Sequence, residues 1–594
     1  MNILFPSQRA TVADFVVGTL FLALCFVFFL HQDIYNEGWC SLHYLFGPYL
    51  AFYDGCAKDV GLEVASYLPP TYVAFALWLY PFKLLGLLTG ASSFPVYLAY
   101  WLKTLTTLTY AASSVPFYRI SLIYLDNPER AKYATAAWLV MPLAFFSQFI
   151  FSQYDIFHVL LTIVGFLMFL RNRLYWASVS FAVAITFKTF PAFVYLPLLL
   201  LHEKRLSRLA LHIMIFATPT VLFDAIYSHS PAFIDGVRHL PHFERVYVAS
   251  IDTFTGGFWR AYIVVLAASL LCAFAYFTEA PSERRIYAAA YFWLAGSILP
   301  FCLILWHPQW LMSVAPAITL TTLVSRRVER FMTLDLIGMF LFVGTVCLTF
   351  QRNVDAAMFR GQWVGLNVNG SHLMANLFNF FGDHSRNVFL SGFIGYLLSQ
   401  LLLKYDILRD GAPGRPWSFL DYNILRSRLY LGSMIFILPA SFAIGMDIAG
   451  SQTWTHNEVY DMTYDATRDR HIEQTIIATG RCITRVAVLM DTSGRTLNDD
   501  ISIEIVDSDG RVLRRTSESI APSHELAWHT FDMENTRVSK DASYTIRLSS
   551  LSGSPGNAFT LNASVTDTYR YGAAVIAGIR QSGDLAFRVW FTEN

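Results

Sequence analysis

The sequence predicts a polytopic all-α membrane protein with about 11–13 membrane-spanning helices, followed by a soluble C-terminal β-sandwich. Composition is the first reason: the 594-residue chain is 55% hydrophobic and 16% aromatic but only 14% charged, whereas soluble domains carry about 25% charged residues. The second reason is a change of pattern near residue 450, where long apolar runs give way to alternating apolar and polar residues. The zero net charge gives no sign of nucleic-acid binding.

The apolar runs of residues 1–450 approach the roughly 20 residues that a membrane-spanning helix needs. The first, residues 14–31, is longer than a typical signal-peptide core, and no small-residue cleavage site follows it. We therefore interpret it as a spanning helix rather than a cleaved leader. The predicted spans centre on residues 14–31, 71–89, 95–117, 132–150, 156–170, 174–200, 207–227, 260–278, 286–305, 309–325, 331–350, 387–403 and 428–449.

Basic residues in the short loops predict the orientation, because cytoplasmic loops carry an excess of Lys and Arg. Basic clusters lie within residues 171–173, 204–208, 284–285, 326–330 and 404–428. If these face the cytoplasm, the loops at about 31–69, 229–259 and 351–386 and the tail face outward. Strict alternation between residues 70 and 155 then requires one segment that does not fully cross. We expect a multi-pass protein of the cytoplasmic (inner) membrane, and a monomer.

The tail, residues 451–594, is predicted to be an extracytoplasmic antiparallel β-sandwich. Segments such as 501–506 and 543–548 alternate apolar and polar residues, and Gly, Asp, Ser and Pro separate them. The strand pattern is similar to that of carbohydrate-binding modules, so the tail either binds an acceptor glycan or serves as a structural lid. The sequence DSDG at 507–510 favours a hairpin turn over a structural calcium site; no other cofactor or metal is expected.

The predicted loop at 31–69 holds two acidic residues and two cysteines. Asp33 lies just past the first apolar run, and Glu37 is one helical turn further on. A carboxylate at the membrane surface can accept a proton from a hydroxyl, as a general base must; the alternative is a hydrated helix end. Cys40 and Cys56 can form a disulfide if the loop faces an oxidising compartment, or they are two free thiols.

Two further polar positions interrupt apolar segments. Asp155 joins two predicted helices, where it is either a helix N-cap or a ligand for a sugar hydroxyl or a metal. Lys188 lies in the otherwise apolar stretch TFKTFP. A lysine there either extends its ammonium to the membrane interface or contacts a phosphate as a compact charge.

The segment LWHPQWLM places His307 between two predicted spans on the outer side. Trp306 and Trp310 beside it are either membrane-interface residues or a platform for a sugar ring. The loop at 229–260 adds a basic cluster that could attract an anionic headgroup. Its members are Arg238, His239, His242, Arg245 and Arg260.

The order of these features resembles the GT-C superfamily of polytopic glycosyltransferases, most of all the prokaryotic mannosyl- and arabinosyltransferases that use polyprenyl-phosphate sugars. The resemblance covers about residues 10–350. It rests on the acidic first loop, Tyr67-Leu68-Pro69-Pro70, Ser152-Gln153-Tyr154-Asp155, the Lys188 segment and the late His307-Pro motif. Relative to the family, Tyr-Pro-Pro has an inserted Leu, and Ser152 replaces a Gly.

The resemblance implies a role for each matched residue. Asp33 is the implied general base, with Glu37 as the second candidate. Lys188 and His307 match positions near the donor phosphate and sugar, with Gln153, Tyr154 and Asp155 beside them. Sugar stacking is expected from Tyr67, Trp306 and Trp310, and anion attraction from Arg238, Arg245 and Arg260. The implied reaction is a metal-independent, inverting transfer from a polyprenyl-phosphate sugar to a glycan or glycolipid acceptor at the outer face.

Three other functions remain open. A polymerase or ligase of lipid-linked glycans would also work at the outer face, but on a lipid diphosphate. A lipid or glycan transporter often has related halves, and residues 1–225 and 226–450 show no similarity to each other. A non-catalytic anchor for the β-sandwich would need neither the long first loop nor a lysine in an apolar segment.

Overall fold

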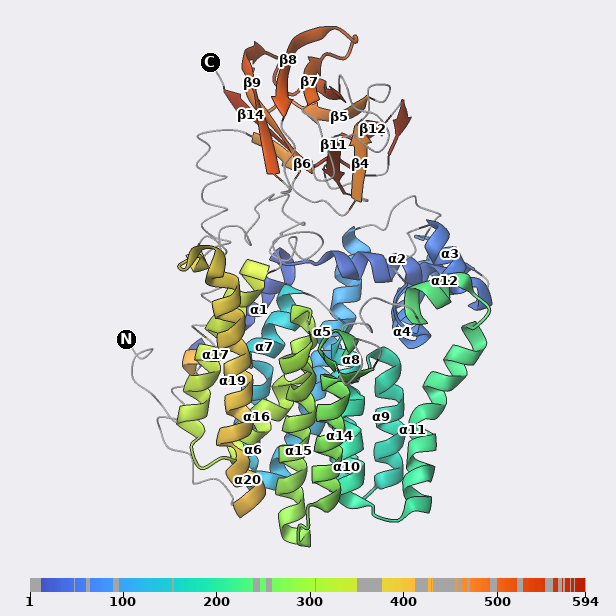
Figure 1. Cartoon of the computed structure of the whole chain (residues 1–594), viewed down its shortest axis with the longest axis vertical. Coiled ribbons are helices and arrows are strands. Elements are labelled where there is room, and N and C mark those ends of the chain that lie inside the picture. The colour runs from blue at the N-terminus through green and yellow to red at the C-terminus, as the bar shows by residue number, and fades with distance from the viewer. Residues whose placement is uncertain are drawn as a thin grey trace. The chain divides into compact units, whose positions relative to one another are not determined.

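A computed structural model describes most of the chain, with its elements coloured by residue number in Figure 1. The described residues are 12–47, 49–59, 65–88, 96–151, 154–238, 246–252, 259–304, 306–349, 377–411, 426–428, 430, 454–457, 462–466, 471–491, 499–520, 527–550, 559–564, 569, 572–576, 578–581 and 583–592. The chain divides near residue 440 into a helical unit and a β unit. The predicted combination of a helical membrane region and a β-rich tail is confirmed.

The helices of the first unit follow most of the predicted apolar runs. They are α1 (Val12–Phe28), α2 (Gln32–Phe46), η1 (Tyr49–Ala51), α3 (Phe52–Asp59), α4 (Pro69–Leu84), α5 (Val96–Leu125), α6 (Pro128–Leu139), α7 (Pro142–Phe145), η2 (Phe146–Ile150), α8 (Ile156–Leu170), α9 (Leu174–Phe187), α10 (Pro191–His202), α11 (Leu206–Tyr227), α12 (Pro231–Phe233), η3 (Ile234–Arg238), α14 (Ile263–Phe277), α15 (Ser282–Leu303), η4 (Pro308–Ser313), α16 (Ala315–Val324), α17 (Val328–Thr349), η6 (Gly382–His384), α19 (Ser385–Leu403) and α20 (Tyr405–Asp410). The predicted span 428–449 lies almost wholly outside the described residues.

Four helical segments of the described chain are long and apolar enough to cross a membrane: Leu206–Tyr227, Glu283–Leu303, Val328–Thr349 and Gly382–Asp410. A fifth results if α6 and the segment Pro142–Ile150, bent by 48° relative to each other, form one span. Shorter apolar helices such as α8 and α9 pack among them. The protein is therefore a multi-pass membrane protein, and the total of 11–13 spans stays a prediction.

The predicted loop at 31–69 is largely helical. Figure 1 shows α2 running across the ends of the long helices of this unit rather than alongside them. Its sequence contains both polar and apolar residues, and His31 caps its N-terminus by accepting a hydrogen bond from the backbone N–H of Asp33. Pro69 and Pro70 then begin α4, where their missing N–H groups cost nothing.

Two predicted spans are broken. The span at 174–200 divides into α9 and α10, with Lys188 in an extended conformation between them and Pro191 starting α10. The span at 132–150 ends α6 at Leu139 and resumes through α7 into the π-helical turn η2. The predicted span at 174–200 is thus interrupted before Pro191, which cannot donate the hydrogen bond that would continue α9.

The β unit contains two antiparallel sheets. Its strands are β3 (Trp454–Asn457), β4 (Met462–Ala466), β5 (Ile472–Ile477), β6 (Cys482–Asp491), β7 (Asp499–Val506), β8 (Val512–Ile520), β9 (Ala527–Arg537), β10 (Ser543–Ser550), β11 (Phe559–Ala563), β12 (Ala574–Ile576), β13 (Ile579–Arg580) and β14 (Phe587–Thr592). One sheet has the order β13-β12-β5-β10-β7-β8, and the other has β3-β14-β6-β11-β4 with β9 also paired to β6. A short separate ribbon, β1 (Ser250–Asp252) and β2 (Arg260–Tyr262), belongs to the helical unit.

Alternate residues of both sheets fill one apolar core, as the sequence pattern requires. Ile503 and Ile546 come from one sheet and Val488 and Val589 from the other, and all four are buried. The DSDG segment forms the β7–β8 turn: the Asp507 carboxylate accepts hydrogen bonds from the N–H groups of Asp509 and Arg511. A calcium ion at this turn stays a prediction.

Candidate functional site

The acidic part of the site lies on α2. Asp33 and Glu37 are one helical turn apart, and they differ in exposure: the Asp33 side chain is 27% exposed, whereas Glu37 is buried. The Nδ1 atom of His31 lies 3.5 Å from Asp33 Oδ1. The two acids therefore present one carboxylate that a solute can reach and one that it cannot.

Glu37 contacts the segment that precedes α8. The Tyr154 hydroxyl donates a hydrogen bond of 3.1 Å to Glu37 Oε1. Burial raises the pKa of Glu37 well above its usual 4.5, and the negative charge of Asp33 adds to this effect. The hydrogen bond from Tyr154 and the positive charge of Lys188 oppose the shift. Glu37 thus holds its proton to a higher pH than an exposed glutamate does.

Lys188 is enclosed by aromatic rings and one acid. Its ammonium lies 3.3 Å from Asp155 Oδ1 and donates a 3.0 Å hydrogen bond to the Tyr67 hydroxyl. The ring centroids of Tyr67 and Trp310 are 4.4 and 5.0 Å from Nζ, close enough for cation–π attraction. An ammonium has three N–H donors, so a further acceptor can bind while both contacts remain.

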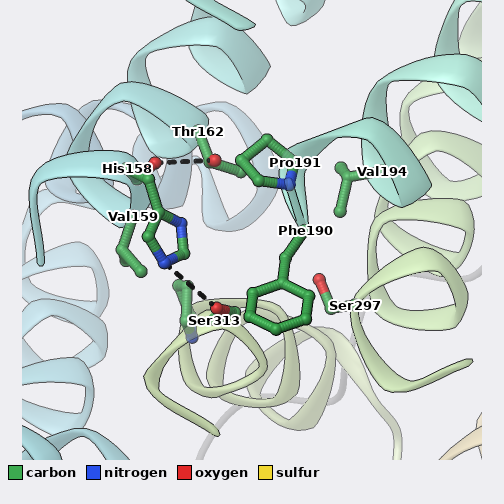
Figure 2. A pocket seen from close by; sticks show the side chains of 9 residues that line it. His158, Val159, Thr162, Phe190, Pro191, Val194, Ser297 and Ser313 are labelled. Atoms are coloured by element: carbon green, nitrogen blue, oxygen red, sulfur yellow. Dashed lines mark hydrogen bonds between the residues drawn. The ribbon is translucent and has the colours of Figure 1, made fainter. Parts of the chain in front are cut away.

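Asp155 connects this lysine to a small pocket. It occupies the N-cap position of α8 but makes no side-chain capping bond, because its Oδ1 faces Lys188 and, at 3.5 Å, His158 Nε2. The predicted capping role was therefore wrong. Figure 2 shows the His158 ring directed at Ser313, with Nε2 3.4 Å from the Ser313 hydroxyl. The pocket, which also includes Phe190 and Ser297, has room for about one water molecule.

The structure brings most of the sequence-predicted residues together, from elements far apart in the chain. The group around Glu37 and Lys188, which we call the acid–lysine site, contains Asp33, Glu37, Tyr67, Tyr154, Asp155, Lys188 and Trp310. His307 adjoins it, since its ring lies 4.9 Å from that of Trp310.

Other predicted residues have different surroundings. Trp306 packs against Phe342 and Phe393 in the helix core. Arg238 forms two hydrogen bonds of 2.6 Å with Asp224, and Arg260 lies 3.3 Å from Asp252. Gln153 and Arg245, with Ser152, His239 and His242, lie outside the described residues.

Sequence reasoning missed two residues at this site. His158 follows Asp155 by three positions, so both lie on one face of α8, and an ionisable residue within an apolar helix was a usable signal. Ser313, in η4, carried no such signal because serine is common in membrane helices. Among the residues that the structure describes, no group of three or more His, Cys, Asp or Glu side chains is placed to hold a metal ion.

Cys40 of α2 and Cys56 of α3 are joined in a disulfide, with their Cα atoms 5.3 Å apart. The bond ties the helix that carries Asp33 and Glu37 to the next helix.

We expect the double variant Cys40→Ser/Cys56→Ser to lose about 3 kcal/mol of stability, the value typical of a short closed loop. Thermal unfolding with and without reductant measures this. Cys272→Ser, a free cysteine of α14, is the control, and equal reductant sensitivity of the wild type and the double variant would contradict the expectation.

The raised pKa of Glu37 predicts a pH effect on stability. The unfolded chain loses this proton near pH 4.5 and the folded chain only at higher pH, so the contribution of Glu37 to stability falls as the pH rises between these two values. Glu37→Gln cannot ionise and should flatten the decline. Unfolding temperatures of both proteins from pH 4 to 8 test the sign, and parallel curves would disprove it.

Comparisons with known proteins give a weak structural likeness. No protein-family model matches the chain, and no curated protein does. Among solved structures, the arabinosyltransferase EmbB from Mycobacterium smegmatis, solved by single-particle cryo-EM, is similar with 12% identity and a TM-score of 0.33 over 98% of this chain. The match covers 66% of that protein, so this chain spans about two thirds of its length. A likeness at this level carries no argument about function, which must come from the residues of the site.

Proposed function

We propose that the protein is a membrane glycosyltransferase that moves a sugar from a polyprenyl-phosphate donor to a glycan or glycolipid acceptor, without a metal. The observation that carries this proposal is the acid–lysine site, where a reachable carboxylate on α2 lies beside a buried acid and an enclosed lysine. The motif order that resembles GT-C glycosyltransferases supports the same reaction. The protein would act alone, as a monomer.

Asp33 is the general base of the proposed reaction. Its carboxylate takes the proton of the acceptor hydroxyl, whose oxygen attacks the anomeric carbon of the donor sugar. The bond from that carbon to the phosphate oxygen breaks, and the lipid phosphate leaves with the electron pair. One displacement inverts the anomeric configuration.

Lys188 stabilises the leaving phosphate. Its third N–H donor is available to a phosphate oxygen while Tyr67 and Asp155 hold the other two, and a positive charge held in place favours the developing negative charge. Trp310 and Tyr67, whose rings adjoin the ammonium, offer apolar faces to the donor sugar. His307 supports Trp310 by ring contact.

We place this site on the extracytoplasmic side of the inner membrane. The basic loop clusters support a cytoplasmic location for the opposite helix ends. The disulfide between Cys40 and Cys56 supports the extracytoplasmic location of the site itself, because such bonds persist in oxidising compartments. By the same chain topology the β unit is extracytoplasmic.

The test uses purified full-length protein and a panel of radiolabelled polyprenyl-phosphate sugars. Transfer of label to a glycan acceptor, together with release of the lipid phosphate, is the expected result. Transfer only from a lipid-diphosphate glycan would identify a polymerase or ligase instead. Movement of labelled lipid across vesicle membranes without transfer would identify a transporter, and either result would overturn the proposal.

The β unit would bind the acceptor glycan through one face of a sheet. The Arg588 guanidinium lies 4.0 Å from the Trp528 ring, and Arg485 lies 4.9 Å from the Trp590 ring. These side chains alternate with core residues such as Val589, so they share the outer face of the β9-β6-β14 sheet. Partly exposed aromatic rings suit the apolar faces of sugars, and arginines suit their oxygens.

The double variant Trp528→Ala/Trp590→Ala should weaken glycan binding about tenfold or more, the usual effect of truncating aromatic anchors. Calorimetric titration with arabino- and manno-oligosaccharides measures it. Trp176→Ala removes an exposed tryptophan of α9 in the helical unit and serves as the control. Unchanged affinity in the double variant would remove the β unit from acceptor binding.

A further inference from the structure

Lys103 of α5 is a fully buried lysine that the proposed reaction does not use. Its ammonium lies within hydrogen-bonding distance of four backbone carbonyl oxygens from two segments, which share its three N–H donors. Those of Cys25 (3.1 Å) and Phe26 (2.9 Å) belong to the last turn of α1, that of Phe29 follows directly after α1, and that of Phe149 (3.2 Å) belongs to η2. We call this cluster the α1–η2 junction.

The first half of the junction closes the end of α1. The last carbonyl groups of a helix have no partner within the helix, and the helix dipole makes that end negative. Lys103 supplies both donors and a positive charge there. The Tyr100 hydroxyl, one turn earlier on α5, donates to the Val27 carbonyl at 2.5 Å. One face of α5 thus provides the C-terminal cap of α1.

The second half fixes η2 to the same face of α5. Besides the bond from Lys103 to Phe149, the Gln148 amide donates to the Thr106 hydroxyl at 3.1 Å. The Phe149 ring packs edge-on against Tyr110, 5.7 Å away. The π-helical turn is therefore held by one charged, one polar and one aromatic contact.

Both segments lead directly into the acid–lysine site. From Phe29 the chain continues through His31 to Asp33, and from Phe149 it continues through Phe151 to Tyr154. The rings of His31 and Phe151 lie 4.6 Å apart, and the two paths meet again where Tyr154 donates to Glu37. A shift at the junction would therefore change the position of the α2 acids relative to the segment of Tyr154 and Asp155.

We propose that Lys103 is a positioning residue. Through the α1–η2 junction it fixes the position of the α2 carboxyl groups relative to Tyr154 and Asp155. An ammonium buried at this depth is costly unless it is fully hydrogen-bonded, and here the surrounding backbone carbonyl groups of both segments offset that cost. The consequence for turnover rests on the proposed function; the consequence for geometry does not.

The test compares Lys103→Met with Lys404→Met. Lys404 is a matched control, because it is equally buried and its ammonium donates to the Ile318 carbonyl and to the Thr321 and Thr322 hydroxyls, between α16 and α19. The readout independent of activity is modification of Glu37 by a water-soluble carbodiimide, followed by peptide mass spectrometry. Lys103→Met should raise this modification severalfold in protein that remains folded, whereas Lys404→Met should not.

With donor and acceptor present, Lys103→Met should lower kcat about 10–100-fold, the range for a catalytic group displaced by about 1 Å, with donor KM unchanged. Equal Glu37 modification and equal kcat in the two lysine variants would overturn the proposal. If Lys103→Met does not fold, Tyr100→Phe removes one bond of the same cap and must shift both readouts in the same direction. A wild type without transfer activity would refute the proposed function, while the modification result would still decide the role of Lys103.

Discussion

Asp33→Asn is expected to lower sugar transfer about 10²–10⁴-fold, the contribution typical of a general base. An amide cannot take the proton of the acceptor hydroxyl, but it has the size of the carboxylate and stands at a partly exposed position. The protein should therefore fold and bind the donor as before. Initial rates with the donor and acceptor that the panel experiment selects, and donor binding to the same preparation, measure both expectations.

A second acid, on the neighbouring helix α3, provides the control. Asp54 of α3 accepts hydrogen bonds from the Ser230 hydroxyl and the Ala232 N–H through Oδ1, and the amide oxygen of Asp54→Asn can accept the same bonds. That variant should keep full activity. Glu37→Gln separates the two acids of α2: if it abolishes transfer while Asp33→Asn remains active, Glu37 is the base instead.

Lys188→Met is expected to destabilise the protein by about 3–5 kcal/mol, because removal of one partner leaves a buried charge uncompensated. That charge is Asp155, whose side chain is fully buried against the lysine. The same change should raise the donor KM, since the phosphate loses its cation. Thermal unfolding and steady-state kinetics measure the two effects separately.

The double variant Lys188→Met/Asp155→Asn distinguishes a structural role from a phosphate-binding role. Without the buried carboxylate, most of the lost stability should return, whereas the donor KM should stay high. Recovery of both would mean that Lys188 only neutralises Asp155. Lys132→Met breaks an exposed ion pair with Glu129 and should change neither quantity, as expected for surface pairs.

The sequence located most of the residues that gather at the site, but not how they are bonded. Lys188 stood out because a lysine in an apolar stretch needs a partner. Asp155 stood out because it lies between two apolar runs. Local rules favoured an N-cap for Asp155 and left Lys188 open between an interface position and a phosphate contact. The actual ion pair depends on how the ends of α8 and α9 pack, which neither segment encodes alone.

Arg238 and Arg260 illustrate the same limit. Both lie in a segment that was predicted to be an outer loop, and its positive charge suggested an anionic ligand. In the structure Arg238 pairs with Asp224 and Arg260 with Asp252. A count of basic residues along the chain contains no information about which acids lie beside them. Lys103 was not predicted as a functional residue. It lies in the predicted span 95–117, which is apolar enough to indicate a membrane helix whether or not it contains one lysine.

The sequence by itself determined the class of this protein: a multi-pass helical membrane region and a β-rich tail. Membrane insertion depends on apolar runs of about 20 residues, and a strand with one buried face shows alternation with a period of 2 residues. Both patterns are visible in a single chain. The tertiary structure alone decided the breaks, the partner of Lys188 and the α1–η2 junction around Lys103. Those features depend on which carbonyl and carboxylate groups long-range packing brings within about 3 Å of a buried ammonium.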